Sequence, residues 1–314
     1  MSHVQIDADG RLRHLITLEG LERSHISGML DRAVELREAF SATGSRPQLL
    51  AARTVVNLFF EPSTRTRSSF ELAARRLGAN VLNFDISGSS TSKGESLEDT
   101  LATLEAMQAD AFIVRHKENG TPERLARHAQ RAAILNAGDG NHAHPTQGLL
   151  DALTIRDRHP DLASLKVVIC GDIRHSRVAR SDVHVLKTLG VAEVRLCGPA
   201  ALMPDASELQ ACPRFDSFDE AIEGCDAIIM LRLQKERMVA GLAGSESEYF
   251  QRFGLNATRL RRANSEAMVL HPGPMNRGVE IAPEVADGPQ SCVLRQVANG
   301  IPVRMAVLAT LLEG

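Results

Sequence analysis

The chain lacks the features of a nucleic-acid-binding surface. It has no tryptophan, a single tyrosine, a formal net charge of −3 and no long run of lysine and arginine. Proteins that hold nucleic acids usually combine basic charge with aromatic rings on which the bases stack. The composition therefore argues against a nucleic-acid partner, and the arginines must serve something smaller.

The chain also lacks the marks of a secreted or membrane protein. The beginning MSHVQIDADGRLRHL carries charges throughout, and no apolar stretch approaches the roughly 20 residues of a membrane span. Its cysteines form no C-x-x-C pair, which is typical of buried or incidental thiols in a reducing compartment. These five cysteines are Cys170, Cys197, Cys212, Cys225 and Cys292. We predict a cytoplasmic protein with no membrane partner.

Short apolar runs alternate with segments of helical spacing along most of the chain. Hydrophobic residues make up 43% and charged residues 24% of the 314 positions, enough for a globular protein with two domains. Because helical patterns lie between most of the apolar runs, we expect an α/β protein with parallel sheets covered by helices. The predicted strands are residues 54–59, 81–84, 111–114, 132–136, 166–170, 193–197, 227–231 and 267–270.

A break in this alternation predicts the domain boundary. The stretch AGDGNHAHPTQ, residues 137–147, is rich in glycine, histidine and proline, and a second series of strands follows it. We place the boundary after residue 146, so that residues 1–146 and 147–292 form the two domains. The ending, residues 293–314, is helical by pattern, and we expect this helix to pack back on the first domain.

Hydroxyl and guanidinium groups crowd one predicted strand-to-helix turn. The stretch FEPSTRTRSSFE, residues 60–71, follows the first predicted strand and opens a helical pattern. The first N–H groups of a helix lack internal partners and lie in a positive field, so an anion binds well there. The alternative is that a serine merely caps this helix and that the arginines are solvated. The side chains concerned are Ser63, Thr64, Arg65, Thr66 and Arg67.

Further polar clusters follow other predicted strands of the first half. Arg115 and His116 come directly after residues 111–114, at the end where open α/β sheets usually bind ligands. His144 can donate to a polarised carbonyl oxygen, and Gln147 can accept from an amide NH₂ group. Lys93 lies in the small-residue loop 87–96. This loop is either a flexible surface linker, or it carries Lys93 as a mobile cation that closes over a bound anion.

The second half repeats this arrangement. GDIRHSRVARS, residues 171–181, follows a strand but lacks the G-x-G-x-x-G spacing of a dinucleotide site, so a nicotinamide cofactor is not indicated. Its arginines form either an exposed basic stripe or a stripe with one member that grips a carboxylate. Arg232 follows residues 227–231, and HPGPMNRGVEI, residues 271–281, follows the last strand. Its prolines stiffen a loop that offers backbone carbonyl acceptors.

Taken together, these motifs resemble those of aspartate carbamoyltransferase catalytic chains, within the aspartate/ornithine carbamoyltransferase family. The resemblance runs in order from Leu15 to the C-terminus. STRT and HPxQ alone would indicate only a carbamoyltransferase, whereas KGE, R-x-Q-K-E-R and HPGPxNRGVE select the aspartate branch. The matching segments begin at Ser63, Lys93, Arg115, His144, Gly171, Arg232 and His271.

The resemblance implies a reaction, an assembly and a division of labour between the domains. Residues 1–146 with the C-terminal helix would bind carbamoyl phosphate, and residues 147–292 would bind L-aspartate. The α-amino group of aspartate would attack the carbonyl carbon, giving N-carbamoyl-L-aspartate and phosphate in pyrimidine biosynthesis, with no metal and no organic cofactor. The chain would form a homotrimer with active sites shared between subunits, either alone or in a higher assembly with regulatory or dihydroorotase-like chains.

The resemblance also assigns residues to roles. The catalytic residues would be Arg65, Thr66, Arg115 and His144. The carbamoyl-phosphate-binding residues would be Ser63, Thr64, Arg65, Thr66, Ser89, Arg115, His144, Gln147, Pro272, Gly273 and Pro274. The aspartate-binding residues would be Lys93, Arg177, Arg232 and Gln234. The loop serine falls at Ser89 or at Ser92, and we prefer Ser89.

Two alternatives remain at this point. Ornithine carbamoyltransferases share the phosphate turn and the HPxQ motif, but their loop typically carries S-M-G and H-C-L-P where this chain has Leu233-Gln234-Lys235 and HPGP. A substrate with a cationic side chain would also be repelled by Arg232. The other alternative is an inactive homologue that serves as a scaffold for a pathway enzyme.

Overall fold

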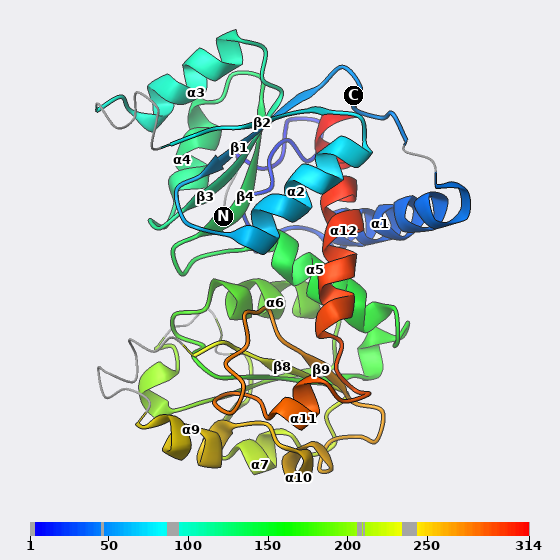
Figure 1. Cartoon of the computed structure of the whole chain (residues 1–314), viewed down its shortest axis with the longest axis vertical. Helices are drawn as coiled ribbons and strands as arrows, with labels where there is room; N and C mark the ends of the chain where they lie inside the picture. The colour runs from blue at the N-terminus through cyan, green and yellow to red at the C-terminus, as the bar shows by residue number, and fades with distance from the viewer. Residues whose placement is uncertain are drawn as a thin grey trace. The chain divides into compact units, whose positions relative to one another are not determined.

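The computed structural model describes residues 4–44, 47–86, 94–205, 209, 211–233 and 244–313. The chain divides into two compact units, which are described separately here (Figure 1). Unit 1 comprises Met1–Leu150 and Ala298–Gly314, and unit 2 comprises Asp151–Val297. The predicted domain boundary after residue 146 stays a prediction.

Unit 1 is built on a four-stranded parallel sheet in the order β2-β1-β3-β4. The strands are β1 Thr54–Phe59, β2 Asn80–Asn83, β3 Ala111–His116 and β4 Ala133–Asp139. The helices are α1 Arg23–Thr43, α2 Thr64–Arg76, α3 Leu97–Ala106, α4 Thr121–His128 and the first half of α5 Pro145–Arg156. Every residue of β4 is buried, as expected for a parallel strand covered on both faces.

The C-terminal helix α12, Val293–Leu312, packs against the helices of unit 1. The Arg37 guanidinium on α1 donates to the Asn299 side-chain oxygen at 2.9 Å. The Arg304 guanidinium lies 4.9 Å from the centre of the Phe70 ring on α2. These contacts confirm the prediction that the last helix returns to the first part of the chain.

Unit 2 contains a five-stranded parallel sheet in the order β7-β6-β5-β8-β9. The strands are β5 Lys166–Cys170, β6 Glu193–Cys197, β7 Arg214–Phe215, β8 Ala227–Met230 and β9 Met268–Leu270. The helices are α6 Arg177–Thr188, α7 Phe218–Ala221, α9 Glu246–Phe253, α10 Ala257–Leu260 and α11 Pro283–Ala286, with short 3-10 turns at Leu162–Ser164 and Ala200–Leu202. Side chains of α7 and α9, among them Phe218, Tyr249 and Phe253, pack on residues of β5 and β8.

The predicted α/β fold with parallel sheets is confirmed, with two local corrections. The predicted break began at residue 137, but β4 continues through Asp139. The strand can continue because the buried side chains of Asn136 and Asp139 form hydrogen bonds with each other and with nearby backbone groups. The strand β7 was missed, since its two residues, Arg214 and Phe215, are too few to show a period.

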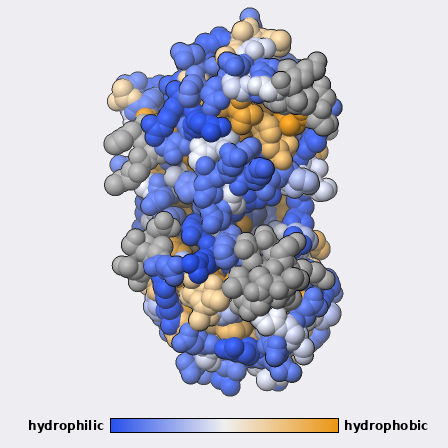
Figure 2. Space-filling view, turned by 90° about the vertical axis from the view of Figure 1, so that its left-hand side faces the viewer, coloured by the Kyte–Doolittle hydropathy of each residue, from blue (hydrophilic) through white to orange (hydrophobic). Residues whose placement is uncertain are grey.

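Within the described residues, no helix is both long and apolar enough to cross a membrane. Figure 2 shows that mainly hydrophilic residues cover the face in view, with smaller apolar patches.

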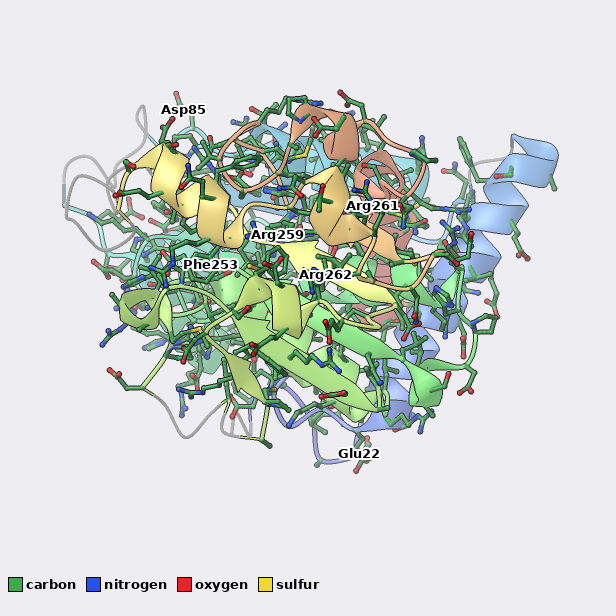
Figure 3. The ribbon with its side chains drawn as sticks, turned by 90° about the horizontal axis from the view of Figure 1, so that it is seen from below. Glu22, Asp85, Phe253, Arg259, Arg261 and Arg262 are labelled. Atoms are coloured by element: carbon green, nitrogen blue, oxygen red, sulfur yellow. The ribbon has the colours of Figure 1, made fainter. Side chains whose placement is uncertain are left out.

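Arg259 stabilises the end of α9 in unit 2. Its guanidinium, 11% exposed, donates to the Gly254 and Gln251 carbonyl oxygens at 2.7 and 2.6 Å and pairs with Asp219 at 2.8 Å. Figure 3 shows Arg259 close to Phe253, the last residue of this helix. Carbonyl groups at a helix C-terminus lack internal partners and carry partial negative charge, so a cation is favourable there.

Replacing Arg259 by alanine is expected to lower the free energy of unfolding by about 2–3 kcal/mol, since several acceptors, most of them in part-buried hydrogen bonds, lose a charged donor. Urea denaturation checks this value. Arg261 offers a matched control two residues further on, because it is exposed and contacts only Thr258 among the contacts found in the described residues. Arg261→Ala should change the free energy by less than about 0.5 kcal/mol. Equal losses in the two variants would contradict the capping role.

Candidate active site

The turn between β1 and α2 carries the predicted anion site. Ser63 is the N-cap residue of α2 and has extended backbone dihedrals, but within the described residues its hydroxyl makes no capping hydrogen bond. The first turn of the helix contains no acidic residue. The N–H groups of this turn and the Ser63 and Thr64 hydroxyls are therefore suited to an anion such as phosphate.

A hollow of about 610 Å³ lies beside this turn. Of the predicted phosphate-binding residues, Ser63 and Thr64 line it, Arg65 is exposed next to them, and Thr66 is buried at 8% exposure. The lining residues are Phe59, Phe60, Glu61, Pro62, Ser63, Thr64, Arg67, Ser68 and Glu71. A hydrogen bond from Asn83, aided by Arg75, lowers the pKa of the Glu71 carboxyl. Glu71 is therefore a charged neighbour of the hollow that already has polar partners.

Arg115 is held at the carboxyl end of β3, next to the same turn. It lies in register with Phe59 on β1, and its carbonyl oxygen accepts the Phe60 N–H at 2.9 Å. Its side chain is only 15% exposed; Nε lies 3.3 Å from the Glu61 carboxylate, and Nη1 donates to the Ala137 carbonyl at 3.3 Å. The guanidinium is thus buried enough to act strongly on a bound oxygen atom.

His116, although adjacent, has a local structural role. Its ring packs edge-on against Phe60 at 5.1 Å between centroids, and its Nδ1 accepts the Glu118 N–H at 3.1 Å. Burial is the main cause that lowers the pKa of this imidazole. The ring therefore favours the neutral form and braces the turn that leads into α4.

His144 directly precedes α5 and Gln147 lies in its first turn, just beyond the carboxyl end of β4. Both are buried, with exposures of 4% and 9%, and the Gln147 N–H donates to the His144 carbonyl at 2.9 Å. The preceding loop is organised by a buried carboxylate, Asp139, which accepts N–H donors from Ala143 and Gly120 at 3.1 and 2.9 Å. The His142 ring donates a hydrogen bond to the same carboxylate at 3.1 Å, and this bond raises the pKa of His142.

Asp139 and Asn136 support the loop that leads to the predicted site residue His144, and sequence reasoning missed them. Asn136 donates to the Ile16 carbonyl and to Asp139, both at 2.8 Å, and accepts the Gly138 N–H at 2.8 Å. A polar pair inside an otherwise apolar strand was the available signal, since buried polar groups need partners. Through these hydrogen bonds the pair fixes the conformation of the backbone that leads to His144.

In unit 2, Arg177 and Arg232 follow the neighbouring strands β5 and β8. Arg177 is the first residue of α6, after Ser176, whose hydroxyl caps the helix by accepting the Ala179 N–H at 3.1 Å. Arg232 is exposed and follows Leu231, whose N–H donates to the Cys170 carbonyl at 2.8 Å. Both arginines thus lie at the carboxyl edge of the second sheet.

The three arginines at 174, 177 and 180 have different surroundings. Arg174 forms an exposed ion pair with Asp205 at 2.5 Å, and Arg180 donates to the Arg174 carbonyl at 3.0 Å. Arg177 is half-buried at the helix start. These differences favour one ligand-binding arginine over a uniform solvated stripe.

The loop after β9 supplies the predicted carbonyl acceptors. Pro272 and Gly273 are half-buried, Pro274 is exposed, and the peptide bond between Gly273 and Pro274 is cis. Gly273 has a φ of +66°, a conformation that favours glycine. Because β9 pairs with β8, this loop lies at the same sheet edge as Arg232.

The structure thus brings the predicted residues together in two sets, each at the carboxyl edge of one sheet. In unit 1 the set comes from β1, β3 and β4 and comprises Ser63, Thr64, Arg65, Thr66, Arg115, His144 and Gln147. In unit 2 it comes from β5, β8 and β9 and comprises Arg177, Arg232, Pro272, Gly273 and Pro274. The predicted residues Ser89, Lys93 and Gln234, and the alternative Ser92, lie outside the described residues.

This arrangement is suited to small anions. The first set offers helix N–H groups, hydroxyls and cations to a phosphate group, together with an imidazole for a neighbouring oxygen atom. The second set offers two guanidinium groups, each able to take a carboxylate through two N–H donors, and carbonyl acceptors for an amide.

Two family models match the chain. The model for the carbamoyl-P binding domain of aspartate/ornithine carbamoyltransferases matches residues 13–157, and the model for the Asp/Orn binding domain matches residues 163–311. An aspartate carbamoyltransferase catalytic subunit of Xanthomonas campestris pv. campestris (strain B100) is 60% identical over 314 residues, covering 99% of this chain and 100% of that protein.

Solved structures share the fold. An aspartate transcarbamoylase from Trypanosoma cruzi, in complex with carbamoyl aspartate and phosphate, matches with a TM-score of 0.88 and 31% identity over 97% of both chains. An ornithine carbamoyltransferase from Pyrococcus furiosus matches with a TM-score of 0.86 and 27% identity over 96% of this chain and 97% of that one. By its sequence, its motifs and its fold, the chain belongs to the aspartate/ornithine carbamoyltransferase family.

Proposed function

We propose that the chain is an aspartate carbamoyltransferase, which transfers the carbamoyl group of carbamoyl phosphate to the α-amino group of L-aspartate. The products are N-carbamoyl-L-aspartate and phosphate. The observation that carries the proposal is that two sets of residues suited to anions lie at sheet edges, a helix N-terminus in unit 1 and two arginines in unit 2. The name of the full-length relative at 60% identity supports the aspartate branch.

Carbamoyl phosphate binds to the set in unit 1. The Ser63–Thr66 turn holds the phosphate group through N–H and hydroxyl donors, and Arg65 neutralises its charge, which makes phosphate a better leaving group. Thr66, Arg115 and His144 hold the carbonyl oxygen as it becomes an oxyanion. Ser89 adds a hydroxyl from the loop that precedes α3.

The carbamoyl NH₂ group needs acceptors. Gln147 offers its side-chain oxygen, and Pro272, Gly273 and Pro274 offer backbone carbonyls. A set of acceptors here fixes the orientation of the carbamoyl plane, so that its carbon faces the incoming amine.

L-Aspartate binds through its two carboxylates. Arg177 and Arg232 each take one of them, and Lys93 and Gln234 complete the pocket. The amine has to reach the carbonyl carbon, so the reaction requires that both sets of residues serve one active site when the substrates are bound.

The chemical step then runs through a tetrahedral intermediate. The amine nitrogen forms a bond to the carbonyl carbon, the carbonyl oxygen takes the negative charge, and the bond from carbon to the phosphate oxygen breaks. The departing phosphate accepts the proton lost by the amine. Every atom comes from the two substrates without a redox change, so the protein contributes orientation and charge stabilisation.

The chain works as a homotrimer with shared active sites, in the cytoplasm and in pyrimidine biosynthesis. The strand β2 at the edge of the first sheet supports a subunit contact in this region. Leu82 on β2 is 44% exposed and Leu72 on α2 is 46% exposed, apolar side chains that a subunit contact would cover.

The proposal is tested by measuring product formation with aspartate and with ornithine separately. We expect kcat/KM for aspartate to exceed that for ornithine by at least about 10³-fold, since a cationic side chain is repelled by Arg232. The shared fold of both enzymes makes this assay necessary. Preferential carbamoylation of ornithine would overturn the assignment, and a purified trimer without turnover would favour the scaffold alternative.

A further inference from the structure

A buried polar pair closes the loop that follows β9. His271 and Glu280 begin and end the segment HPGPMNRGVE, the orange stretch between β9 and α11 in Figure 1. Both side chains are 0% exposed, and the His271 Nε2 lies 3.1 Å from the Glu280 carboxylate. A carboxylate in such a place is costly unless it is paired and hydrogen-bonded. We therefore looked for the structure that this pair maintains.

The hydrogen bonds define which nitrogen of His271 carries the proton. The Gly273 N–H donates to Nδ1 at 2.8 Å, so Nδ1 is an acceptor. Nε2 then carries the proton and donates to Glu280 Oε1. The same carboxylate oxygen accepts the Asn276 N–H at 2.5 Å. The pair thus holds two backbone N–H groups of the loop, on either side of Pro274.

Asn276 extends the network to the residue that follows Arg232. Its side-chain NH₂ donates to the Leu233 carbonyl at 2.9 Å. On the other side of the loop, the His271 N–H donates to the Gln296 side chain at 2.9 Å, and Gln296 donates to Asp151 at 2.6 Å. Gln296 and Asp151 are both buried. The loop is therefore tied at both ends to the interior of unit 2.

We infer that Glu280 and Asn276 are positioning residues for the two substrates. Glu280, directly and through His271, sets the direction of the carbonyl groups at Pro272, Gly273 and Pro274. Asn276 fixes the backbone conformation at Leu233 and thereby the direction in which the Arg232 side chain leaves the chain. The inference rests on the proposed function, because it assigns these groups to the carbamoyl NH₂ and to a carboxylate of aspartate.

Three substitutions at two positions separate the effects. Glu280→Leu removes the acceptor and is expected to lower kcat/KM for carbamoyl phosphate by about 10–100-fold, the range seen when a support of a ligand-binding group is lost. Glu280→Gln keeps an acceptor oxygen for His271 and the Asn276 N–H, so it should stay within about 3-fold of wild type. Asn276→Ala should raise KM for aspartate about 10-fold while KM for carbamoyl phosphate changes less than about 3-fold.

A control and a second readout keep the test decisive. Arg277 lies in the same loop but forms an exposed ion pair with Asp287 at 2.7 Å, so Arg277→Ala should leave both KM values unchanged. Amide hydrogen exchange of Gly273 and Asn276 should be faster in Glu280→Leu than in Glu280→Gln. If Glu280→Leu does not fold, the split between the two KM values in Asn276→Ala decides.

The outcomes distinguish this inference from the proposed function. Wild-type turnover with aspartate, together with unchanged KM values in Glu280→Leu and Asn276→Ala, would overturn the inference alone. Equal losses in Glu280→Leu and Glu280→Gln, or equal rises of both KM values in Asn276→Ala, would overturn it too, since they indicate general destabilisation. No wild-type turnover with aspartate would remove the proposed function and the inference with it.

Discussion

Replacing Arg115 by alanine is expected to lower kcat by about 10²–10³-fold, the loss typical of removing one donor to a developing oxyanion. The guanidinium is suited to this role because it is only 15% exposed and is held by Glu61 and by the Ala137 carbonyl. In such surroundings a charge acts more strongly on a bound oxygen than it would in water. Steady-state kinetics with both substrates at saturation measures the effect.

Two companion variants make this result specific. Lys117→Ala removes an exposed cation two residues further on and should leave kcat within about 2-fold of wild type, because exposed charges are screened. Arg115→Ala should also weaken carbamoyl-phosphate binding, since Glu61 loses this cation and then repels phosphate, and adding Glu61→Gln should recover part of that affinity. Loss of kcat in Lys117→Ala as large as in Arg115→Ala would contradict the assigned role.

Replacing Arg177 by alanine is expected to lower kcat/KM for aspartate by about 10²–10³-fold, as truncation of one member of a hydrogen-bonded charge pair typically costs 2–5 kcal/mol. The residue opens α6 at the carboxyl edge of the second sheet and is half-buried. The affinity for carbamoyl phosphate should change little, because its phosphate is assigned to the turn at Ser63. Kinetics at varied aspartate and fixed saturating carbamoyl phosphate tests the split.

Arg174 provides the matched control for this variant. It lies on the same segment but forms an exposed ion pair with Asp205, 43% and 83% exposed, so Arg174→Ala should change kcat/KM by less than about 3-fold. This pair of variants also separates the two interpretations of the arginine pattern. Similar losses in both would show a diffuse basic surface instead of a carboxylate clamp.

The alternation of apolar runs and helical patterns was sufficient to predict the parallel sheets. Strands such as Lys166–Cys170 are buried on both faces, so they appear as continuous apolar runs bounded by polar turns. The two-residue strand β7 and the last residues of β4 could not be predicted. Strand β7 is too short to show an alternating pattern of apolar residues. The end of β4 runs through Gly138 and Asp139, and the buried Asp139 carboxylate accepts backbone hydrogen bonds there that no local pattern predicts.

Candidate site residues were found because they directly follow predicted strands. The neighbouring positions of β1 and β3, which place Arg115 beside the turn at Phe60, are a matter of strand order and are not encoded in any local pattern. The same holds for His271 and Glu280, nine positions apart in sequence, whose buried contact depends on how the loop folds. Polar residues of this kind look like ordinary loop residues until their partners are known.

The central claim is that cationic groups distant in sequence act together on two small anionic substrates. A crystal structure of the trimer with a bisubstrate analogue, which joins a phosphonate to an aspartate moiety, tests it most directly. We predict the phosphonate at the turn that begins at Ser63, the carbonyl oxygen within hydrogen-bond distance of Arg115 and His144, and the two carboxylates on Arg177 and Arg232. A bound analogue with Arg115, Arg177 and Arg232 directed to separate patches of solvent would contradict the account.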